Sequence, residues 1–457
     1  MSNKTQDAVY NAKELGVGKV TILGLQHMFA MFGSTVLVPI LTGLNVSTTL
    51  LFAGIGTLLF HLLTKGKVPA FLGSSFAFLG GYFAIAPMVD GKSNVEMIPY
   101  ACFGVACAGL LYLVMALLIK LFSANRIMKF FPPIVTGPII IAIGLTLSKS
   151  AIDSCSSNWI IALVAILAVI ICNIFGKGMI KIIPILIGVV ASYLVGICMG
   201  KVDFSGVKDA AWVGLPINMD TTVFAMFGDN FDASLMITAI ITIMPIALAT
   251  IVEHIGDVSA ISSTVGRNFI KDPGLHRTLL GDGLATIAAS LFGAPANTTY
   301  GENTGVLNLS KVYDPMVVRL AACFAIFFSF CPKFAAVIQA MPTATVGGIS
   351  LILYGMISAV GVRNVVENKV DFAKSRNVII AALILVLSIG INYSSAGSIA
   401  FAIGDINISL SGLAVGALTG IILNAILPGK DYNFDEENPE DTGVNFEVGQ
   451  TRSMKTE

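Results

Sequence analysis

The sequence predicts an all-α integral membrane protein of about fourteen transmembrane segments, built as two inverted repeats of seven. Three observations indicate this fold: an apolar composition, a series of apolar stretches, and landmarks that recur in the second half. Hydrophobic residues make up 55% of the 457 residues and charged residues 12%, about half the roughly 25% of soluble domains. With a mean hydropathy of +0.85, the chain has too little polar surface for water and belongs in a bilayer.

The apolar stretches divide the chain into spans. A spanning helix needs about 20 apolar residues. Two further segments, near 69–87 and 295–310, are shorter and interrupted by glycine and proline. The longer stretches are expected to begin near residues 20, 46, 98, 133, 158, 181, 235, 279, 316, 341, 377 and 408.

Lysine and arginine gather in alternate loops. With the N-terminus inside, the inner loops contain clusters such as Arg363 to Arg376, whereas the outer loops contain isolated lysines such as Lys92 and Lys149. This bias predicts both termini on the cytoplasmic side of the cell's inner membrane. Residues 1–19 and 429–457 are expected to be cytoplasmic tails, and the acidic second one has the composition of a disordered segment. The net charge of +0 argues against nucleic acid as a partner.

Landmarks recur between the halves in the same order. Gln26-His27 returns as Glu253-His254, 227 residues later, and the interrupted stretch that begins at Pro69 returns at Pro295, 226 later. If each half has seven spans, the second half enters the membrane in the opposite sense. Interrupted segments at matching positions then predict a binding site near the bilayer midplane. The alternative is that small-residue patterns recur in any helical membrane protein.

Three acids, Glu253, Asp257 and Glu302, fall inside apolar runs. A charge at this depth costs roughly 2.5–3.5 kcal/mol on insertion scales, so such residues indicate function. Glu253 and Asp257 are four residues apart and share one helix face, and His254 lies beside that face. No lysine or arginine lies in the same runs, which makes a buried ion pair hard to arrange. Clustered carboxyl groups favour retention of a proton at neutral pH, as a proton-coupled site requires.

The two interrupted segments are rich in hydrogen-bonding groups. Irregular backbone at membrane depth is tolerated only where it lines a cavity or is packed inside protein. Phe76 and Tyr300 are expected at matching places in them, where an aromatic ring can stack on a flat ligand, although packing is the commoner role. Half-helix N-termini near Phe76 and Gly301 would present N–H groups to a ligand. The expected ligand is a small planar molecule with both amide N–H and C=O groups.

The chain resembles the nucleobase–ascorbate transporters, the second nucleobase–cation symporter group, and within it the bacterial uracil permeases. The similarity extends from about residue 19 to 428. Its most specific part is Glu302-Asn303-x-Gly305 with the ending Ser310-Lys311. The matching stretches are residues 26–39, 68–78, 253–257, 272–276, 297–305 and 347–354.

The resemblance implies a core domain (20–130 and 233–338) and a gate domain (131–232 and 339–428). Short β pieces in the third and tenth segments would pair across the core, and gate domains would form a homodimer in the lipid bilayer. The implied function is proton-coupled import of uracil by alternating access. The alternative is a proton symporter of the same family for purines such as xanthine or uric acid. Glu302 stands where purine carriers often have Gln and favours uracil, because a carboxylate only accepts hydrogen bonds.

The resemblance also assigns roles to residues. Glu253 and Glu302 would bind the base, in a pocket that Phe76, Tyr300 and Gly301 line. Ser350 and Tyr354 would close this pocket from the gate domain. The residues implied in proton coupling are Glu253, His254, Asp257 and Glu302. Gln26, Ser75 and Asn303 would support the site. Asp257 stands where some uracil permeases carry His, so the proton path in this chain is expected to differ from theirs.

The alternative from another functional class is a membrane enzyme or a channel. The chain contains no G-x-S-x-G, H-E-x-x-H or G-x-x-x-x-G-K-[ST] motif, and Gly91-Lys92-Ser93 has Ala86 where a phosphate-binding loop needs glycine. No cofactor and no metal are therefore expected, and no enzymatic activity.

Overall fold

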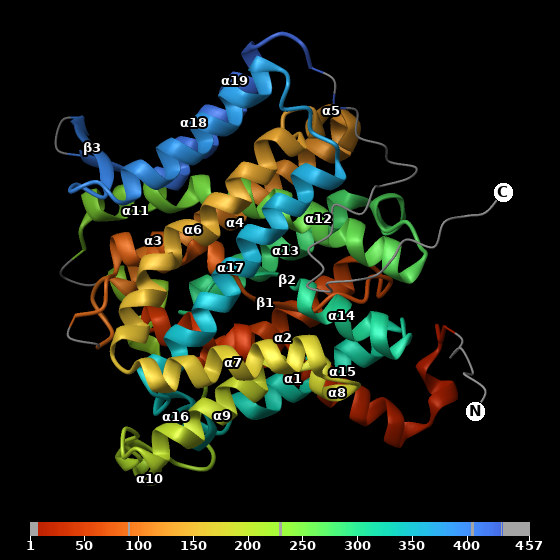
Figure 1. Cartoon of the computed structure of the whole chain (residues 1–457), viewed down its shortest axis with the longest axis vertical. Helices are drawn as coiled ribbons and strands as arrows, with labels where there is room; N and C mark the ends of the chain where they lie inside the picture. Colours follow the sequence, from red (N-terminus) through yellow and green to blue (C-terminus); the bar gives the residue numbers. More distant parts are fainter. Residues whose placement is uncertain (1–7, 90–91, 228–230, 404–405, 431, 433–457) are drawn as a thin grey trace.

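The computed structural model describes residues 8–89, 92–227, 231–403, 406–430 and 432. Most of these residues are helical, as predicted (Figure 1). The predicted acidic tail lies almost entirely outside the described residues. Each predicted span begins within four residues of a helix start.

The first half contains seven membrane segments, of which the third is interrupted. The segments are α1 Val17–Thr42, α2 Val46–Leu63, β1 Leu72–Ser74 with the 3-10 turn η2 Phe76–Phe78 and α3 Leu79–Ile85, α4 Ile98–Phe122, α6 Pro133–Ser156, α7 Trp159–Phe175 and α9 Pro184–Cys198. Between and after them lie the short helices α5 Ala124–Met128, α8 Met179–Ile182 and α10 Ser205–Asp209.

The second half repeats this order. Its segments are α11 Ala233–Ile243 with α12 Ala247–Val265, α13 Leu275–Leu291, β2 Asn297–Thr299 with α14 Gly301–Ser310, α15 Pro315–Ser329, α17 Thr343–Glu367, α18 Ser375–Asn392 and α19 Gly412–Ile426. The short helix α16 Pro332–Gln339 is bent by 87° from α15. Among the described residues, seven helices are long and apolar enough to cross a membrane unaided, and the remaining apolar helices are shorter.

The packing of the helices follows the repeat. Helix α4 packs on α13 as its counterpart α15 packs on α2. In the same way α7 packs on α9 as α18 packs on α19, and α6 and α17 pack along each other. Figure 1 shows α17 lying beside α6 across the middle of the molecule. The predicted arrangement of seven plus seven segments is therefore confirmed.

The two interrupted segments meet at the centre of the fold. Strands β1 and β2 pair antiparallel, with Leu72 opposite Thr299 and Gly73 opposite Thr298. Two threonines on the flanking helices fix these strands. The Thr57 hydroxyl accepts from the Leu72 N–H over 2.9 Å, and the Thr286 hydroxyl donates to the Asn297 carbonyl over 2.7 Å. The expectation of short strands that pair across the core is confirmed.

A second pair of strands was not predicted. Strands β3 Ser398–Ile403 and β4 Ile406–Ser411 form an antiparallel hairpin between α18 and α19. The last span was expected near residue 408, but the helix begins at Gly412, where the Ser411 side chain accepts from the Ala414 N–H. Residues 408–411 belong to the hairpin because a short apolar run suits a strand as well as a helix.

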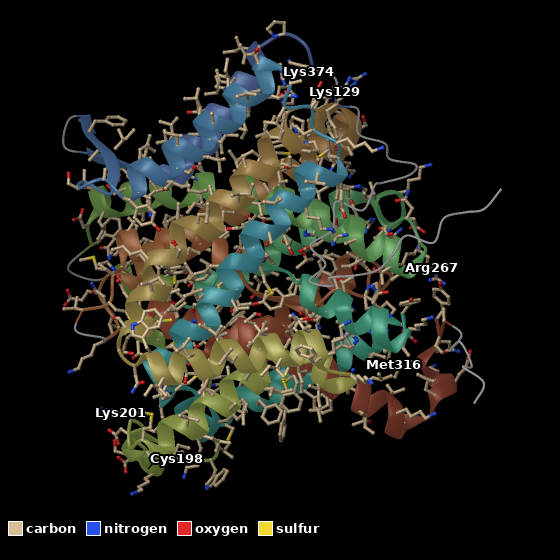
Figure 2. The ribbon with its side chains drawn as sticks, viewed as in Figure 1. Lys129, Cys198, Lys201, Arg267, Met316 and Lys374 are labelled. Atoms are coloured by element: carbon tan, nitrogen blue, oxygen red, sulfur yellow. The ribbon has the colours of Figure 1, made fainter. Side chains whose placement is uncertain are left out.

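The alternate-loop pattern predicts Lys129 and Arg267 on one side of the membrane and Lys201 on the other. In Figure 2 Lys129 and Arg267 lie towards the right, and Lys201 lies on the left.

Candidate functional site

A cavity lies where the two interrupted segments meet. It contains about 630 Å³ of space not filled by atoms, part of it open solvent. One wall is polar and consists of Ser74, Ser75, Glu253, Thr298 and Thr299. Another wall is aliphatic and consists of Ile140 and Ile143 of α6 and Leu353, Ile357 and Val360 of α17.

Two half-helix N-termini face this cavity. The turn η2 begins at Phe76 after Ser75, and α14 begins at Gly301 after Tyr300. All four residues line the cavity, and neither preceding side chain caps the first turn by a hydrogen bond. The first N–H groups of a helix lack intrahelical acceptors and carry its positive end. Both ends can therefore donate to electron-rich atoms of a ligand.

The expected equivalence of Phe76 and Tyr300 is wrong. Phe76 is the first residue of its half-helix, whereas Tyr300 precedes the first residue of its own. The repeat instead relates Ser75 to Tyr300, because each precedes the first residue of its half-helix. The Ser75 N–H donates to the Ala296 carbonyl just as the Tyr300 N–H donates to the Phe71 carbonyl. The two aromatic rings line the same cavity from different positions in the two segments.

The residues that surround Phe76 and Tyr300 differ. The ring of Phe76 contacts that of Tyr354 edge to face, with centroids 6.1 Å apart. The hydroxyl of Tyr300 donates to the Ser74 carbonyl over 2.7 Å. Tyr354 and Ser350 are buried on α17, and the α17 side chains that line the cavity itself are those of its aliphatic wall.

Helix α12 brings three of the predicted residues to the centre. Glu253 lines the cavity and is half-buried. Asp257 and His254 are buried and turn towards β2 instead. The Thr299 hydroxyl donates to Oδ2 of Asp257 over 2.9 Å, and Nδ1 of His254 lies 3.3 Å from the same hydroxyl. One strand residue therefore links both side chains to the cavity wall.

A fourth acid at this depth was not predicted. Asp282 lies in α13, and its Oδ2 is 3.2 Å from Nδ1 of His254, with both side chains at 0% exposure. The acid stands inside an apolar stretch, so the rule that selected Glu253 would have selected it too.

The remaining predicted residues lie around this centre. The side chain of Glu302 lies outside the described part of the chain, and its backbone is the second residue of α14. Nδ2 of Asn303 lies 3.2 Å from Nδ1 of His27, so α14 contacts α1 there. Gln26 is buried on α1. Neither Gln26 nor Asn303 lines the cavity.

Metal binding has no support in the described part of the chain. No group of three or more His, Cys, Asp or Glu residues there could hold a metal ion. The chemistry available at the cavity is hydrogen bonding by a carboxylate, by hydroxyls and by backbone amides.

The family of the chain follows from its similarity to known proteins. The sequence model of the permease family matches residues 18–397. The chain belongs to the permease family. It is therefore a multi-pass membrane transporter, in keeping with its apolar helices.

Relatives in this family align along nearly their whole length. The chain is 41% identical to the uracil permease of Bacillus caldolyticus over 437 residues, which cover 93% of this chain and 96% of the relative. It is 39% identical to the uracil permease of Bacillus subtilis over 417 residues, covering 88% and 91%. The uracil permease of Escherichia coli K12 is 37% identical over 418 residues, covering 88% and 90%.

Solved structures share the fold at low identity. The transmembrane domain of the cyanobacterial bicarbonate transporter BicA aligns with a TM-score of 0.57 at 15% identity, covering 92% of this chain and 99% of that one. The murine anion transporter Slc26a9, in its inward-facing state, aligns with a TM-score of 0.60 at 10% identity, covering 93% and 73%. At such identity the likeness shows the fold of seven plus seven inverted segments alone.

Proposed function

We propose that this permease imports uracil across the cytoplasmic membrane by proton-coupled alternating access. The observation that supports this most directly is the cavity itself, where Glu253 and two half-helix N-termini converge. The names of relatives that align along nearly their whole length agree with it.

Uracil suits the chemistry of these walls. It is a flat ring with two N–H donors and two carbonyl acceptors. The Glu253 carboxylate accepts from a ring N–H, and such charge-assisted hydrogen bonds are stronger than neutral ones. Backbone N–H groups at Phe76 and Gly301 donate to the carbonyls, and Phe76 with the aliphatic wall covers the ring faces. Glu302 is proposed as the second carboxylate, by its place in the first turn of α14.

Proton coupling follows from the acids around α12. We infer that the cluster of Glu253, Asp257 and Glu302 takes up a proton from outside and keeps a carboxylate for the ring N–H, after which the base binds. His254 and Asp257 share the Thr299 hydroxyl, so Thr299 connects groups that can exchange a proton with groups that touch the ligand. Release of base and proton inside the cell resets the cycle.

Alternating access requires two bodies that move against each other. We assign residues 20–130 and 233–338 to the core domain and 131–232 and 339–428 to the gate domain. The polar wall of the cavity then comes from the core and the aliphatic wall, on α6 and α17, from the gate. An apolar wall makes few directional contacts, so it can slide. Both termini are placed in the cytoplasm, and the gate domains are proposed to form a homodimer.

The test is uptake of radiolabelled uracil by cells that lack other nucleobase carriers. Wild-type uptake should be saturable and should collapse with a protonophore. Glu302→Ala should abolish it at an unchanged amount of transporter in the membrane. Uptake that resists the protonophore, or persists in Glu302→Ala, would refute the proposal. Competition by unlabelled bases separates the substrates, since inhibition by xanthine or uric acid but not by uracil would indicate a purine carrier.

A further inference from the structure

The segment before the first span is bound to the ends of two helices that carry the site. Val9 forms a parallel β-bridge with Val312. The Val9 N–H donates to the Lys311 carbonyl and the Tyr313 N–H donates to the Val9 carbonyl, each over 2.8 Å. Lys311 is the residue that ends α14. The N-terminal segment therefore holds the C-terminal end of the half-helix whose other end faces the cavity.

Tyr10 extends this attachment to α12. Its hydroxyl donates over 2.8 Å to the carbonyl of Val265, the last residue of α12. The carbonyls of the last turn of a helix receive no hydrogen bond from within the helix, so Tyr10 supplies a donor there. The guanidinium carbon of Arg267 lies 4.5 Å from the centre of the Tyr10 ring, a cation–π contact. Arg267 lies on the right in Figure 2, the side on which the red segment before α1 lies in Figure 1.

Two more contacts anchor the segment. The Ala12 N–H donates over 2.7 Å to Oδ2 of Asp314, and the other oxygen of this carboxylate accepts from the Met316 N–H at the start of α15. Ala12 is fully buried in a small apolar cluster with Val20, Val312 and Val317. The segment is thus packed as a part of the fold.

Both helices lead directly from these contacts to the site. Glu253 precedes Val265 by twelve residues and Glu302 precedes Lys311 by nine, which is about 18 Å and about 14 Å along a helix. At its N-terminal end α14 follows the short strand β2. A change at its C-terminal end would tilt Gly301 and its N–H relative to Glu253.

We propose that residues 9–15 form a cytoplasmic strap that fixes the orientation of α14 relative to α12, with Val9 and Tyr10 as positioning residues for the binding site. The strap touches no ligand. It acts by keeping the carboxylate of α12 and the helix end of α14 at one spacing, so that both bind the same molecule. The affinity part of this proposal depends on the proposed uptake of uracil.

The decisive variants are Val9→Pro and Tyr10→Ala. Proline at position 9 has no N–H for the Lys311 carbonyl, and alanine at position 10 removes both the bond to Val265 and the ring beneath Arg267. Each should raise KM for uracil at least about three-fold, within the range seen for residues that act at a distance. Ala8→Pro, one residue before the bridge, is the matched control and should leave KM unchanged.

Hydrogen–deuterium exchange gives a readout without any substrate. In Val9→Pro the amides of α14 should exchange faster than in the wild type, while those of its counterpart α3 should not change. Tyr10→Phe, which keeps the ring over Arg267 and loses only one hydrogen bond, provides a milder variant if the others fail to fold.

The proposed role of the strap is overturned if the amide exchange rates of α14 and the KM for uracil in Val9→Pro and Tyr10→Ala equal the wild-type values. It is equally overturned if uptake falls only in proportion to the amount of transporter in the membrane. If the wild type takes up no uracil, the proposed function fails, and the exchange of α14 still decides the role of the strap.

Discussion

The hydroxyl of Tyr300 donates a hydrogen bond to the carbonyl of Ser74 over 2.7 Å, from one interrupted segment to the other. When the half-helix starts Phe76 and Gly301 are superposed, the strand pair Leu72–Thr299 maps onto the pair Ser74–Asn297, and the pair Gly73–Thr298 maps onto itself. The axis that relates the two halves therefore passes through the pair Gly73–Thr298. The short sheet of β1 and β2 places both half-helix ends at one cavity, so the site depends on the geometry of this sheet.

Tyr300→Phe should destabilise the protein by about 1–3 kcal/mol, because the Ser74 carbonyl is buried and loses its donor. The expected readout is a lower midpoint of thermal unfolding in detergent, together with a higher KM. Tyr393→Phe is the control, since it loses a hydroxyl bond of 2.9 Å to the Leu145 carbonyl at an exposed position. Equal melting temperatures for the two variants would contradict this account of Tyr300.

Gly73→Ala should impair both stability and uptake. A β-carbon at Gly73 would lie 2.6 Å from Cε2 of Tyr300 and 2.7 Å from Oγ1 of Thr35, so the ring that borders the cavity must move. Overpacking of this kind typically costs about 1–3 kcal/mol. Gly80→Ala, in the half-helix that follows the same strand, meets no atom within 4 Å. Uptake that stays normal in Gly73→Ala, or falls equally in Gly80→Ala, would refute the steric argument.

The spans and the interrupted segments could be predicted from the sequence because hydropathy and proline placement are local signals. The pairing of β1 with β2 could not be derived this way, since three-residue strands have no usable periodicity, and it rested on the family resemblance. The hairpin of β3 and β4 was missed for a related reason, because its apolar residues adjoin the last span. The half-helices start at Phe76 and Gly301, whereas the sequence was aligned with Phe76 opposite Tyr300, so that alignment was wrong by one position.

Contacts over long sequence distances account for the rest. Nothing near Ala12 indicates that its N–H meets Asp314, 302 residues away. Asp282 gave a local signal, an acid in an apolar stretch, and its pairing with His254 became visible only in three dimensions. Sequence reasoning thus selected most of the polar residues at the centre, and the structure shows which of them share a wall.

Glu253→Gln should reduce uracil binding strongly while the protein still folds. The amide has the shape of the carboxylate, but its nitrogen donates where uracil also donates, so a charge-assisted bond is lost. Such bonds are worth about 1.5–3 kcal/mol, which corresponds to about a ten- to hundred-fold rise in Kd. Calorimetric titration of the purified protein with uracil measures this Kd. Binding at wild-type affinity would exclude Glu253 as the group that accepts the ring N–H.

Asp257→Asn should change the pH dependence of uptake more than the affinity. Asparagine retains an oxygen that can accept from the Thr299 hydroxyl, so the link across 2.9 Å survives while the titrating group disappears. Uptake measured between pH 5 and pH 8 should lose part of its pH dependence, with KM at the optimum within about two-fold of the wild type. An unchanged pH profile combined with lost binding would contradict this role for Asp257.

Asp272→Asn is the control for that measurement. Asp272 lies in the π-helical turn Ile270–Gly274 between α12 and α13. There a hydrogen bond from Lys67 over 2.6 Å lowers the pKa of its carboxyl below 3.8. A depressed pKa means that the ion pair contributes its stability above the unfolded value and loses it only as the pH falls through the folded one. Asp272 therefore stays ionised from pH 5 to pH 8, and its replacement should leave the shape of the profile unchanged. Of the two acids, only Asp257 contacts the strand that lines the cavity. A profile that shifts equally in both variants would therefore show that the effect arises from the net charge of the protein and not from Asp257.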